Sequence, residues 1–321
     1  MKPIWLILLL GGLTAFPVHA LELPGMEAFV REMAEKHGFD QARLGQAFQE
    51  AQYRQSIIDA MERPATRKPW PEYRAAFINT KRIRGGLQFW QRYADVLQRA
   101  EQQYGVPQEI IVALIGVETL YGQQTGRFRT LDALATLAFG YPRRAEFFRD
   151  ELEQFLLLSR EQGFGLLDVQ GSYAGALGIP QFMPGSYRRF AVDFNQDGRI
   201  DLLHDPEDAI GSVAHYLMQY GWVRGEPVAV RARMEENAGC VGNNGTGRSF
   251  EAWVEAGYAP EESMQAAQTA RLFSFDSAEG YDLWFGLNNF EVIMRYNNSP
   301  FYAMSVYELS EALRARREAR D

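Results

Sequence analysis

The chain has a single cysteine, Cys240, among 321 residues. One thiol cannot form an intramolecular disulfide or build a zinc site from several cysteines. Positive charge is also scarce, because 33 Lys and Arg residues face 41 Asp and Glu residues, which gives a formal net charge of −8. A protein that tracks nucleic-acid phosphates needs the opposite balance, so we expect no nucleic-acid partner.

Long apolar runs are missing after the N-terminus, so we expect no integral membrane segment in the mature chain. Residues 1–20 combine a basic start, a short apolar run and small residues at Val18 and Ala20. This pattern is typical of a secretory signal cleaved after Ala20, and an uncleaved N-terminal anchor is the alternative. Because no cysteine follows that could carry a lipid, the pattern predicts an exported, periplasmic protein.

The composition, with 46% hydrophobic and 23% charged residues, is typical of a globular rather than a disordered protein. Apolar residues at helical spacing predict helices within 22–63, 72–104, 108–158, 207–220 and 304–317. Residues 163–186 are rich in loop-forming residues. Alternation at every second residue predicts strands over 227–232, 271–275 and 281–285.

These patterns predict a mainly α protein with a small β subdomain. The predicted parts are a signal peptide (1–20), an N-terminal helical region (21–105), a helical core (106–225), the β subdomain (226–293) and a C-terminal segment that returns to the helical part (294–321).

Glu118 stands at the end of a run that is apolar on all sides. Residues 110–117 contain only Ile, Val, Ala, Leu and Gly, which predicts a buried helix. Burial and the negative end of the helix dipole would both raise the pKa of this carboxyl. A raised pKa suits a general acid, whereas a Glu that reaches solvent or pairs with an Arg would serve only the structure.

Residues 171–184, GSYAGALGIPQFMP, form a loop of small residues with polar and aromatic residues between them. Glycine lets the backbone approach a ligand, Ser172 and Gln181 offer hydrogen bonds, and Tyr173 and Phe182 offer flat surfaces. The same composition suits a tight structural connection between helices, so the loop alone leaves both interpretations open.

Four separated motifs occur in order along the chain. They are residues 116–119 (GVET), 141–145 (YPRRA), the loop 171–184 and residues 295–297 (RYN). In this combination the sequence closely resembles the lytic transglycosylase B family, glycoside hydrolase family 103, which cleaves bacterial peptidoglycan. The resemblance extends from about Trp70 to Leu313, nearly the whole mature chain.

The resemblance implies a lysozyme-like helical core over 106–225, in which Glu118 is the only catalytic carboxylate. This residue would protonate the oxygen of the β-1,4 bond between N-acetylmuramic acid and N-acetylglucosamine, and would then act as base on the muramic acid 6-hydroxyl. Attack of that hydroxyl on C1 would leave a 1,6-anhydromuramic end without consuming water, unlike the usual scheme of two carboxylates. The sequence shows no second carboxylate in a comparably apolar setting.

The resemblance also carries over substrate-contacting positions, which hold aromatic, amide, hydroxyl and guanidinium groups. These are Tyr73, Arg143, Arg144, Ser172, Gln181, Tyr216, Tyr296, Asn297 and Tyr302. Such groups can stack on sugars, hold acetamido groups or bind lactyl and peptide-stem carboxylates, although any one tyrosine could be a core aromatic with a satisfied hydroxyl. Phe147 departs from the family, which can carry a tyrosine there.

Residues 193–201, DFNQDGRID, match the opening of an EF-hand loop, in which Gly198 allows the sharp turn. Position twelve is His204 rather than the usual glutamate, and a neutral imidazole is a poor ligand for a hard cation. The resemblance implies a longer loop in which Asp208 returns to the metal. The predicted calcium ligands are Asp193, Asn195, Asp197, the carbonyl of Arg199 and Asp208.

We expect this calcium ion to be structural and to fix the following helix, which carries Tyr216. Asp205 is expected to cap that helix, with Pro206 in its first position. An Asp/Asn/Gly turn without metal is the alternative. We expect no cofactor for catalysis.

Two other functions stay open on the sequence. A muramidase on the same scaffold would use water, and the reducing end of its product would differ. A catalytically silent glycan-binding or scaffolding protein would bind without turnover, but the intact Glu118 argues against it. In each case we expect peptidoglycan strands as the ligand, with cell-wall synthesis proteins as candidate partners.

Overall fold

The computed structural model describes residues 24–63, 68–236, 238, 247–265, 268–278 and 280–319. The predicted signal peptide and Cys240 lie outside these residues. Within the described part, none of the helices combines the length and the apolar character that a membrane crossing requires. Most of the described chain is helical, so the prediction of a mainly α protein is confirmed.

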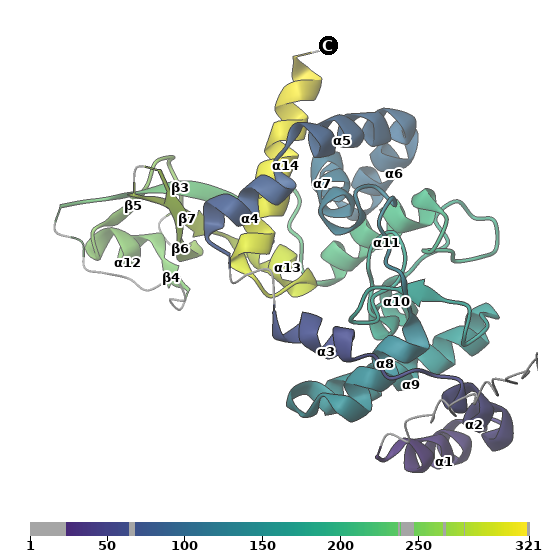
Figure 1. The fold of residues 1–321 in the computed structure, drawn as a ribbon. Coiled ribbons are helices and arrows are strands. Elements are labelled where there is room, and N and C mark those ends of the chain that lie inside the picture. The colour runs from purple at the N-terminus through teal and green to yellow at the C-terminus, as the bar shows by residue number, and fades with distance from the viewer. Residues whose placement is uncertain are drawn as a thin grey trace, which may run out of the picture.

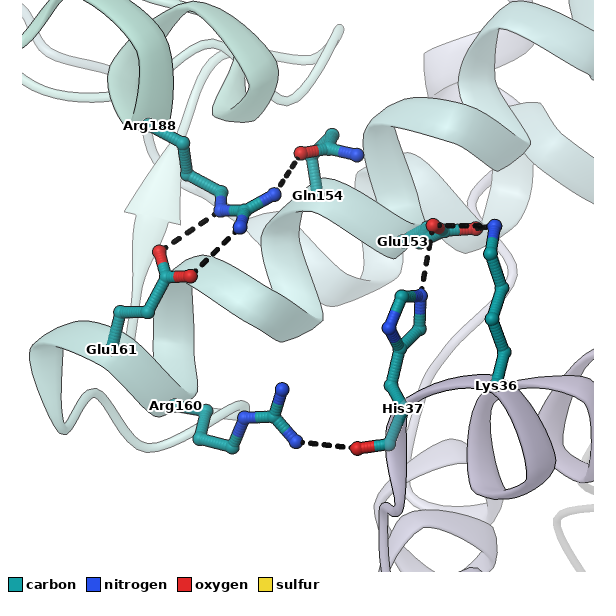
Figure 2. Close-up of polar contacts among 7 residues, drawn as sticks. All are labelled: Lys36, His37, Glu153, Gln154, Arg160, Glu161 and Arg188. Atoms are coloured by element: carbon teal, nitrogen blue, oxygen red, sulfur yellow. Dashed lines mark hydrogen bonds and ion pairs between the residues drawn. The ribbon is translucent and has the colours of Figure 1, made fainter.

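The N-terminal region consists of α1 (Met26–His37), α2 (Gln41–Gln49) and α3 (Gln55–Glu62), as the periodicity predicts. The end of α1 is held against α9 (Ala145–Gln162) by polar contacts, which Figure 2 shows. Lys36 Nζ donates to the Glu153 carboxylate (2.9 Å), His37 Nε2 lies 2.9 Å from the same carboxylate, and Arg160 donates to the His37 carbonyl (2.8 Å). These contacts fix the outer side of α9.

The stretch predicted as helical from 72 to 104 is divided into α4 (Trp70–Phe77), α5 (Thr80–Arg92) and α6 (Ala94–Tyr104). The first break is made by Asn79, whose side-chain oxygen accepts a hydrogen bond from the Arg82 N–H (3.0 Å) and caps α5. The second break is at Tyr93, between α5 and α6.

The helical core is built around α7 (Gln108–Thr119), which contacts α5, α6, α11 (Pro206–Gln219) and α14 (Pro300–Glu318). Its other helices are α8 (Thr130–Gly140), α9, α10 (Pro184–Phe190) and α13 (Asn288–Tyr296), with a 3-10 turn at Pro142–Arg144. A two-residue strand, β1 (Phe128–Arg129), pairs with β2 (Gln170–Gly171). Helix α10 begins inside the stretch predicted as loop.

The β subdomain is one antiparallel sheet with the strand order β4-β6-β7-β3-β5. The strands are β3 (Ala229–Met234), β4 (Arg248–Ser249), β5 (Tyr258–Pro260), β6 (Thr269–Ser277) and β7 (Gly280–Gly286). A short helix that the sequence did not predict, α12 (Phe250–Glu255), buries Trp253 against the sheet. The sheet and α12 lie on the opposite side of α14 from α8 and α9 (Figure 1). The predicted end of the subdomain at residue 293 falls within α13.

Candidate active site

Helix α7 places Glu118 in its C-terminal turn. Residues 110–117 are buried, because helices pack around α7 on several sides. Leu120 ends the helix in the left-handed conformation (φ 52°). Thr119 ties that end to the loop 171–184, since its hydroxyl donates to the Ile179 carbonyl (2.8 Å). The position of Glu118 is therefore fixed by the core and by the glycine-rich loop together.

The environment of Glu118 raises the pKa of its carboxyl from 4.5 to about 7. Burial against the apolar helix is the largest cause, and it is opposed by a hydrogen bond from Tyr302 and by the charge of Arg82. The Tyr302 hydroxyl donates to Glu118 Oε1 (2.5 Å). The side chain is partly exposed and lines a pocket. Such a carboxyl can hold a proton at neutral pH and release it to a bound ligand.

The pocket has a volume of about 1240 Å³ and is lined by residues of α7, α9, α10, α11 and α13, by the 3-10 turn, by the loop 171–184 and by the segment after α13. Six of the nine predicted substrate residues contribute to its described wall, namely Arg144, Ser172, Gln181, Tyr216, Tyr296 and Asn297. Tyr73, Arg143 and Tyr302 are outside that wall. A pocket of this size suits a ligand larger than one sugar ring.

Tyr216 and Tyr296 form an aromatic cluster with Tyr302. The ring centroids of Tyr216 and Tyr296 are 4.8 Å apart, and those of Tyr296 and Tyr302 are 6.4 Å apart. The Tyr216 hydroxyl donates to the Arg295 carbonyl (2.7 Å), and the Tyr296 hydroxyl donates to the Pro180 carbonyl (2.5 Å). These two hydroxyls hold the pocket together and offer a sugar only their acceptor side.

Tyr73 on α4 is buried and packs against the rings of Trp70, Phe77 and Phe301. Burial raises the pKa of its hydroxyl to about 12, and the negative charge of Glu118 adds to that effect. Tyr73 is therefore neutral and is close enough to Glu118 for the two groups to interact.

The loop 171–184 is held in shape by the two side chains that the sequence marks as ligand contacts. Ser172 Oγ accepts hydrogen bonds from two N–H groups of its own loop (3.2 and 3.0 Å). Gln181 Nε2 donates to the carbonyls of Thr125 and Gly178 (3.0 and 2.9 Å). The loop is therefore both a tight structural connection and part of the pocket wall. The two interpretations that the sequence left open, a structural loop and a ligand-facing loop, are compatible.

Gly178 lies where this loop contacts the EF-hand-like loop. Its φ is +70°, and a Cβ there would lie 2.1 Å from the Leu202 carbonyl oxygen. The same carbonyl accepts a hydrogen bond from the Ile179 N–H (2.8 Å). Only glycine fits this contact, through which the EF-hand-like loop supports the pocket.

The two arginines of the YPRRA motif differ in their surroundings. Both side chains are exposed, but Arg144 lines the pocket, with its guanidinium 4.3 Å from the ring centroid of Phe147, and Arg143 is outside the described wall. Phe147 also lines the pocket and is 38% exposed. The departure from the family at Phe147 therefore keeps an aromatic platform under Arg144 but offers no hydroxyl.

The pocket wall also holds a second carboxylate that the sequence analysis did not single out, the partly buried Glu151. Burial raises its pKa, but its Oε2 accepts a hydrogen bond from the Gly185 N–H (2.8 Å) at the start of α10. The spacing from Phe147 and Phe148 would have indicated this inward face of α9. Arg82, which contacts the end of α7, had no comparable signal in the sequence.

The EF-hand-like loop closes through its own side chains. The Asp193 carboxylate accepts hydrogen bonds from the N–H groups of Asp197 and Gly198 (3.1 and 2.9 Å), and Gly198 adopts φ +89°. Asp208 is buried, and its two oxygens accept hydrogen bonds from loop N–H groups (2.8 Å each). Asp205 caps α11 by accepting from the Glu207 N–H (2.7 Å), as predicted.

In the part of the chain that the structure describes, no three carboxylate, imidazole or thiol side chains are grouped to hold a metal ion. Three of the predicted calcium ligands, Asp193, Asp197 and Asp208, are carboxylates, and they are not gathered into such a group; the other two ligands are an amide oxygen, from Asn195, and a backbone carbonyl, from Arg199. The donor set contains only oxygen, and Asp193, Asn195 and Asp197 lie on one turn. The chemistry of the residues therefore fits a hard cation.

Residues 23–311 match the family of the Transglycosylase SLT domain. Membrane-bound lytic murein transglycosylase B of Escherichia coli (strain K12) is 45% identical to this chain over 300 residues, which cover 90% of this chain and 82% of that protein. The crystal structure of soluble lytic transglycosylase SltB1 from Pseudomonas aeruginosa is 48% identical, with a TM-score of 0.85, and covers 91% of this chain and 99% of that one.

Two further structures were determined with ligands. The Escherichia coli lytic transglycosylase Slt35 in complex with calcium is 44% identical, with a TM-score of 0.86 and a coverage of 92% of this chain and 94% of that one. SltB3 from Pseudomonas aeruginosa in complex with NAG-anhNAM-pentapeptide is 27% identical, with a TM-score of 0.77 and a coverage of 90% and 78%. The predicted fold is confirmed by these similarities, and the chain belongs to the family of the Transglycosylase SLT domain.

Proposed function

We propose that Glu118 performs the chemistry of this lytic murein transglycosylase, first as general acid and then as base. The observation that carries the proposal is a single carboxyl at the end of a buried helix, exposed to the pocket, with a pKa of about 7. At that pKa both the protonated and the ionised form are accessible near neutral pH. Both forms are needed in one turnover.

In the first step, protonated Glu118 gives its proton to the glycosidic oxygen between N-acetylmuramic acid and N-acetylglucosamine, and the bond from that oxygen to C1 breaks. In the second step, the muramic acid 6-hydroxyl attacks C1 and its proton passes to the Glu118 carboxylate. The product is a 1,6-anhydromuramic end, Glu118 is protonated again, and no water is consumed. The complex of SltB3 with NAG-anhNAM-pentapeptide supports this product.

Tyr302 is the group that we expect to orient the reacting carboxyl, because its hydroxyl donates to Glu118 Oε1. The described pocket wall offers the sugars Ser172, Gln181 and Asn297, and it offers acidic groups the guanidinium of Arg144. We infer that Arg144 binds lactyl or peptide-stem carboxylates over the ring of Phe147. Arg143, which is outside the described pocket wall, would contact only a longer ligand.

We also propose that residues 193–208 bind a structural calcium ion through Asp193, Asn195, Asp197, the Arg199 carbonyl and Asp208. The calcium complex of Slt35 supports the choice of ion. The bound ion would supply a rigid link between the loop and α11, which carries Tyr216. No step of the reaction passes through it.

We also propose a division of the chain into functional parts. Residues 106–225 form the catalytic core, 21–105 and 294–321 support it, and 226–293 are an accessory β subdomain. We propose that the chain is exported to the periplasm, where peptidoglycan lies, after removal of residues 1–20. Cell-wall synthesis proteins are the protein partners that we would test.

Mass spectrometry of fragments released from purified peptidoglycan tests the proposal. Glu118→Gln is expected to lower the rate of release at least about a thousandfold, because it removes the exchangeable proton. Glu109→Gln, on the same helix but outside the pocket wall, is the matched control and should release anhydro fragments at nearly the normal rate. Activity of Glu118→Gln within tenfold of the unmodified protein would overturn the assignment.

The reducing ends of the fragments separate the alternatives. Anhydro ends, one water lighter than hydrolysed ends, support the transglycosylase step, and hydrated ends that depend on Glu118 would identify a hydrolase on the same scaffold. Binding of glycan without any release by the folded, calcium-loaded protein would identify a glycan-binding protein.

A further inference from the structure

Arg82 reaches the last turn of α7 from the neighbouring helix α5. The cap of α5 by Asn79 fixes the backbone of Arg82. Its Nη1 donates to the Gly116 carbonyl and, at 3.4 Å, to the Val117 carbonyl. These are carbonyls of the two residues before Glu118, in the last turn of the helix, where the Gly116 carbonyl also accepts a hydrogen bond from the Leu120 N–H (3.2 Å).

The arginine is held in this place by further contacts. The Tyr121 hydroxyl donates to the Arg82 carbonyl (2.9 Å), and a Cβ on Gly116 would lie 2.5 Å from that hydroxyl. The guanidinium lies 5.1 Å from the ring centroid of Phe77. Its Nε is buried and has no hydrogen-bond partner among the described residues. Arg82 therefore holds a partly buried positive charge at a fixed point beside the end of α7.

The groups that face Glu118 come from several elements, and most of them are neutral. They are Tyr73 on α4, Tyr216 on α11, Tyr296 on α13 and Tyr302 on α14, and the pKa of each hydroxyl is raised. Within the described part of the chain, Arg82 is the one full charge that acts on Glu118, and it lowers the pKa of that carboxyl. It opposes both burial and the negative end of the α7 dipole.

We propose that Arg82 is a positioning residue for the reaction, which acts through α7 by binding its last carbonyls and by placing a positive charge behind Glu118. The fork of the guanidinium ties the turn that carries the carboxyl to α4, because Nη1 donates to the α7 carbonyls and Nη2 donates to the Ala76 carbonyl at 3.4 Å. The charge stabilises the carboxylate that forms when the proton leaves. This inference rests on the proposed role of Glu118.

The test is the pH dependence of kcat/KM for fragment release, measured for four proteins. Arg82→Gln removes the charge, Arg82→Lys keeps the charge but not the fork, and Arg84→Gln removes an exposed charge from the same helix as the matched control. Protonated Glu118 is the reactive form of the free enzyme, so kcat/KM falls as the pH rises through its pKa. Without the nearby charge that pKa rises further.

For Arg82→Gln we expect kcat to fall at least about tenfold and the alkaline limb of kcat/KM to move upward by about half a pH unit or more. For Arg82→Lys we expect a similar fall in kcat with the limb close to its original position. Arg84→Gln should match the unmodified protein in both quantities. A purely structural role would lower kcat in both Arg82 variants without moving the limb.

A folded Arg82→Gln variant with an unmoved limb overturns the inference. If circular dichroism shows that this variant does not fold, Arg82→Lys decides, and an unchanged kcat in that variant overturns the inference. Glu118→Gln, measured in the same series, separates the two proposals. If Glu118→Gln keeps its activity, both the proposed function and this inference are overturned. If Glu118→Gln is inactive and the alkaline limb of Arg82→Gln does not move, only this inference is overturned.

Discussion

The end of α7 and the EF-hand-like loop both present carboxylates, but they treat them in opposite ways. Among the described residues, one side chain donates a hydrogen bond to Glu118, the Tyr302 hydroxyl, and much of the surrounding wall is apolar. Asp193, in the loop, accepts two backbone hydrogen bonds, and the buried Asp208 likewise accepts one on each oxygen. The end of α7 thus gives its carboxylate few hydrogen-bond donors, whereas the EF-hand-like loop gives each of these carboxylates two backbone donors.

The difference in the number of hydrogen-bond donors distinguishes a carboxyl suited to proton transfer from carboxylates that hold a loop in shape. A carboxyl with few donors is easily protonated, as the pKa of about 7 for Glu118 shows. Burial raises the pKa of Asp208 as well, but hydrogen bonds from the N–H groups of Phe194, Asn195 and Asp201 oppose that effect. The role of an acidic residue therefore depends on the number of hydrogen-bond donors around it. The effect of each region on the free energy of unfolding or on the reaction rate can be tested.

The largest expected effect is on stability at high pH. The pKa of Glu118 is about 7 in the folded state and 4.5 as its reference value, so the folded protein holds the proton more tightly. Ionisation therefore destabilises the fold by an amount that grows from about pH 4.5 and is complete above about pH 7, on the order of 3 kcal/mol. Glu118→Gln, which cannot ionise, should be spared this loss.

Urea unfolding of both proteins at pH 4.5 and pH 8 measures this prediction. The difference in unfolding free energy between Glu118→Gln and the unmodified protein should increase by about 3 kcal/mol from the lower to the higher pH. Comparing the two pH values cancels the effect of the amide itself. Glu35→Gln, at an exposed position, removes the same charge and should show no such increase. An equal difference at both pH values for Glu118→Gln would contradict the desolvated environment.

The second prediction concerns calcium and the loop. Calcium at a hundred times its dissociation constant should raise the free energy of unfolding by about 2.7 kcal/mol, because only the folded loop gathers the ligands. Backbone N–H groups already satisfy Asp193 without metal, so chelation should lower stability without unfolding the protein. Thermal unfolding with calcium, with magnesium and with a chelator measures the effect.

Asp193→Ala should remove most of the calcium-dependent increase in stability, whereas Asp59→Ala, at an exposed position on α3, should keep it. The comparison within each variant, with and without calcium, removes the effect of the substitution on the apo protein. A full calcium response in Asp193→Ala would rule out the proposed ligand set.

Much of the fold follows from periodicity, and the exceptions have local causes. The apolar run before Glu118 and the alternation in β6 and β7 carry a strong repeat, so their elements form as predicted. Helix α12 has only six residues, and its burial depends on the sheet beneath it. The break before α5 depends on a single cap by Asn79, which leaves the hydrophobic spacing on either side unchanged.

The site divides in the same way. Glu118 could be found because one carboxylate follows a buried run, and the loop 171–184 because its composition is unusual. Arg82 could not, because it lies on an amphipathic helix where charged residues usually face solvent, and Glu151 has only the weak signal of its helical spacing from the buried Phe148. Their contacts, with the end of α7 and the start of α10, arise only when distant helices pack together.

The smallest expected effect, on kcat, comes from removing the hydroxyl that donates to Glu118. Tyr302→Phe removes the hydrogen bond that lowers the pKa of Glu118, so that pKa should rise above about 7. The carboxylate formed during turnover should then lose the one side-chain donor that the described residues give it. We expect kcat to fall about tenfold, which corresponds to about 1.4 kcal/mol. Tyr307→Phe is the matched control, because that hydroxyl lies on the same helix and donates to the Ala229 carbonyl at 3.4 Å. If both variants keep the same kcat, the number of donors around a carboxylate does not set its role here, and the contrast between α7 and the loop must rest on burial alone.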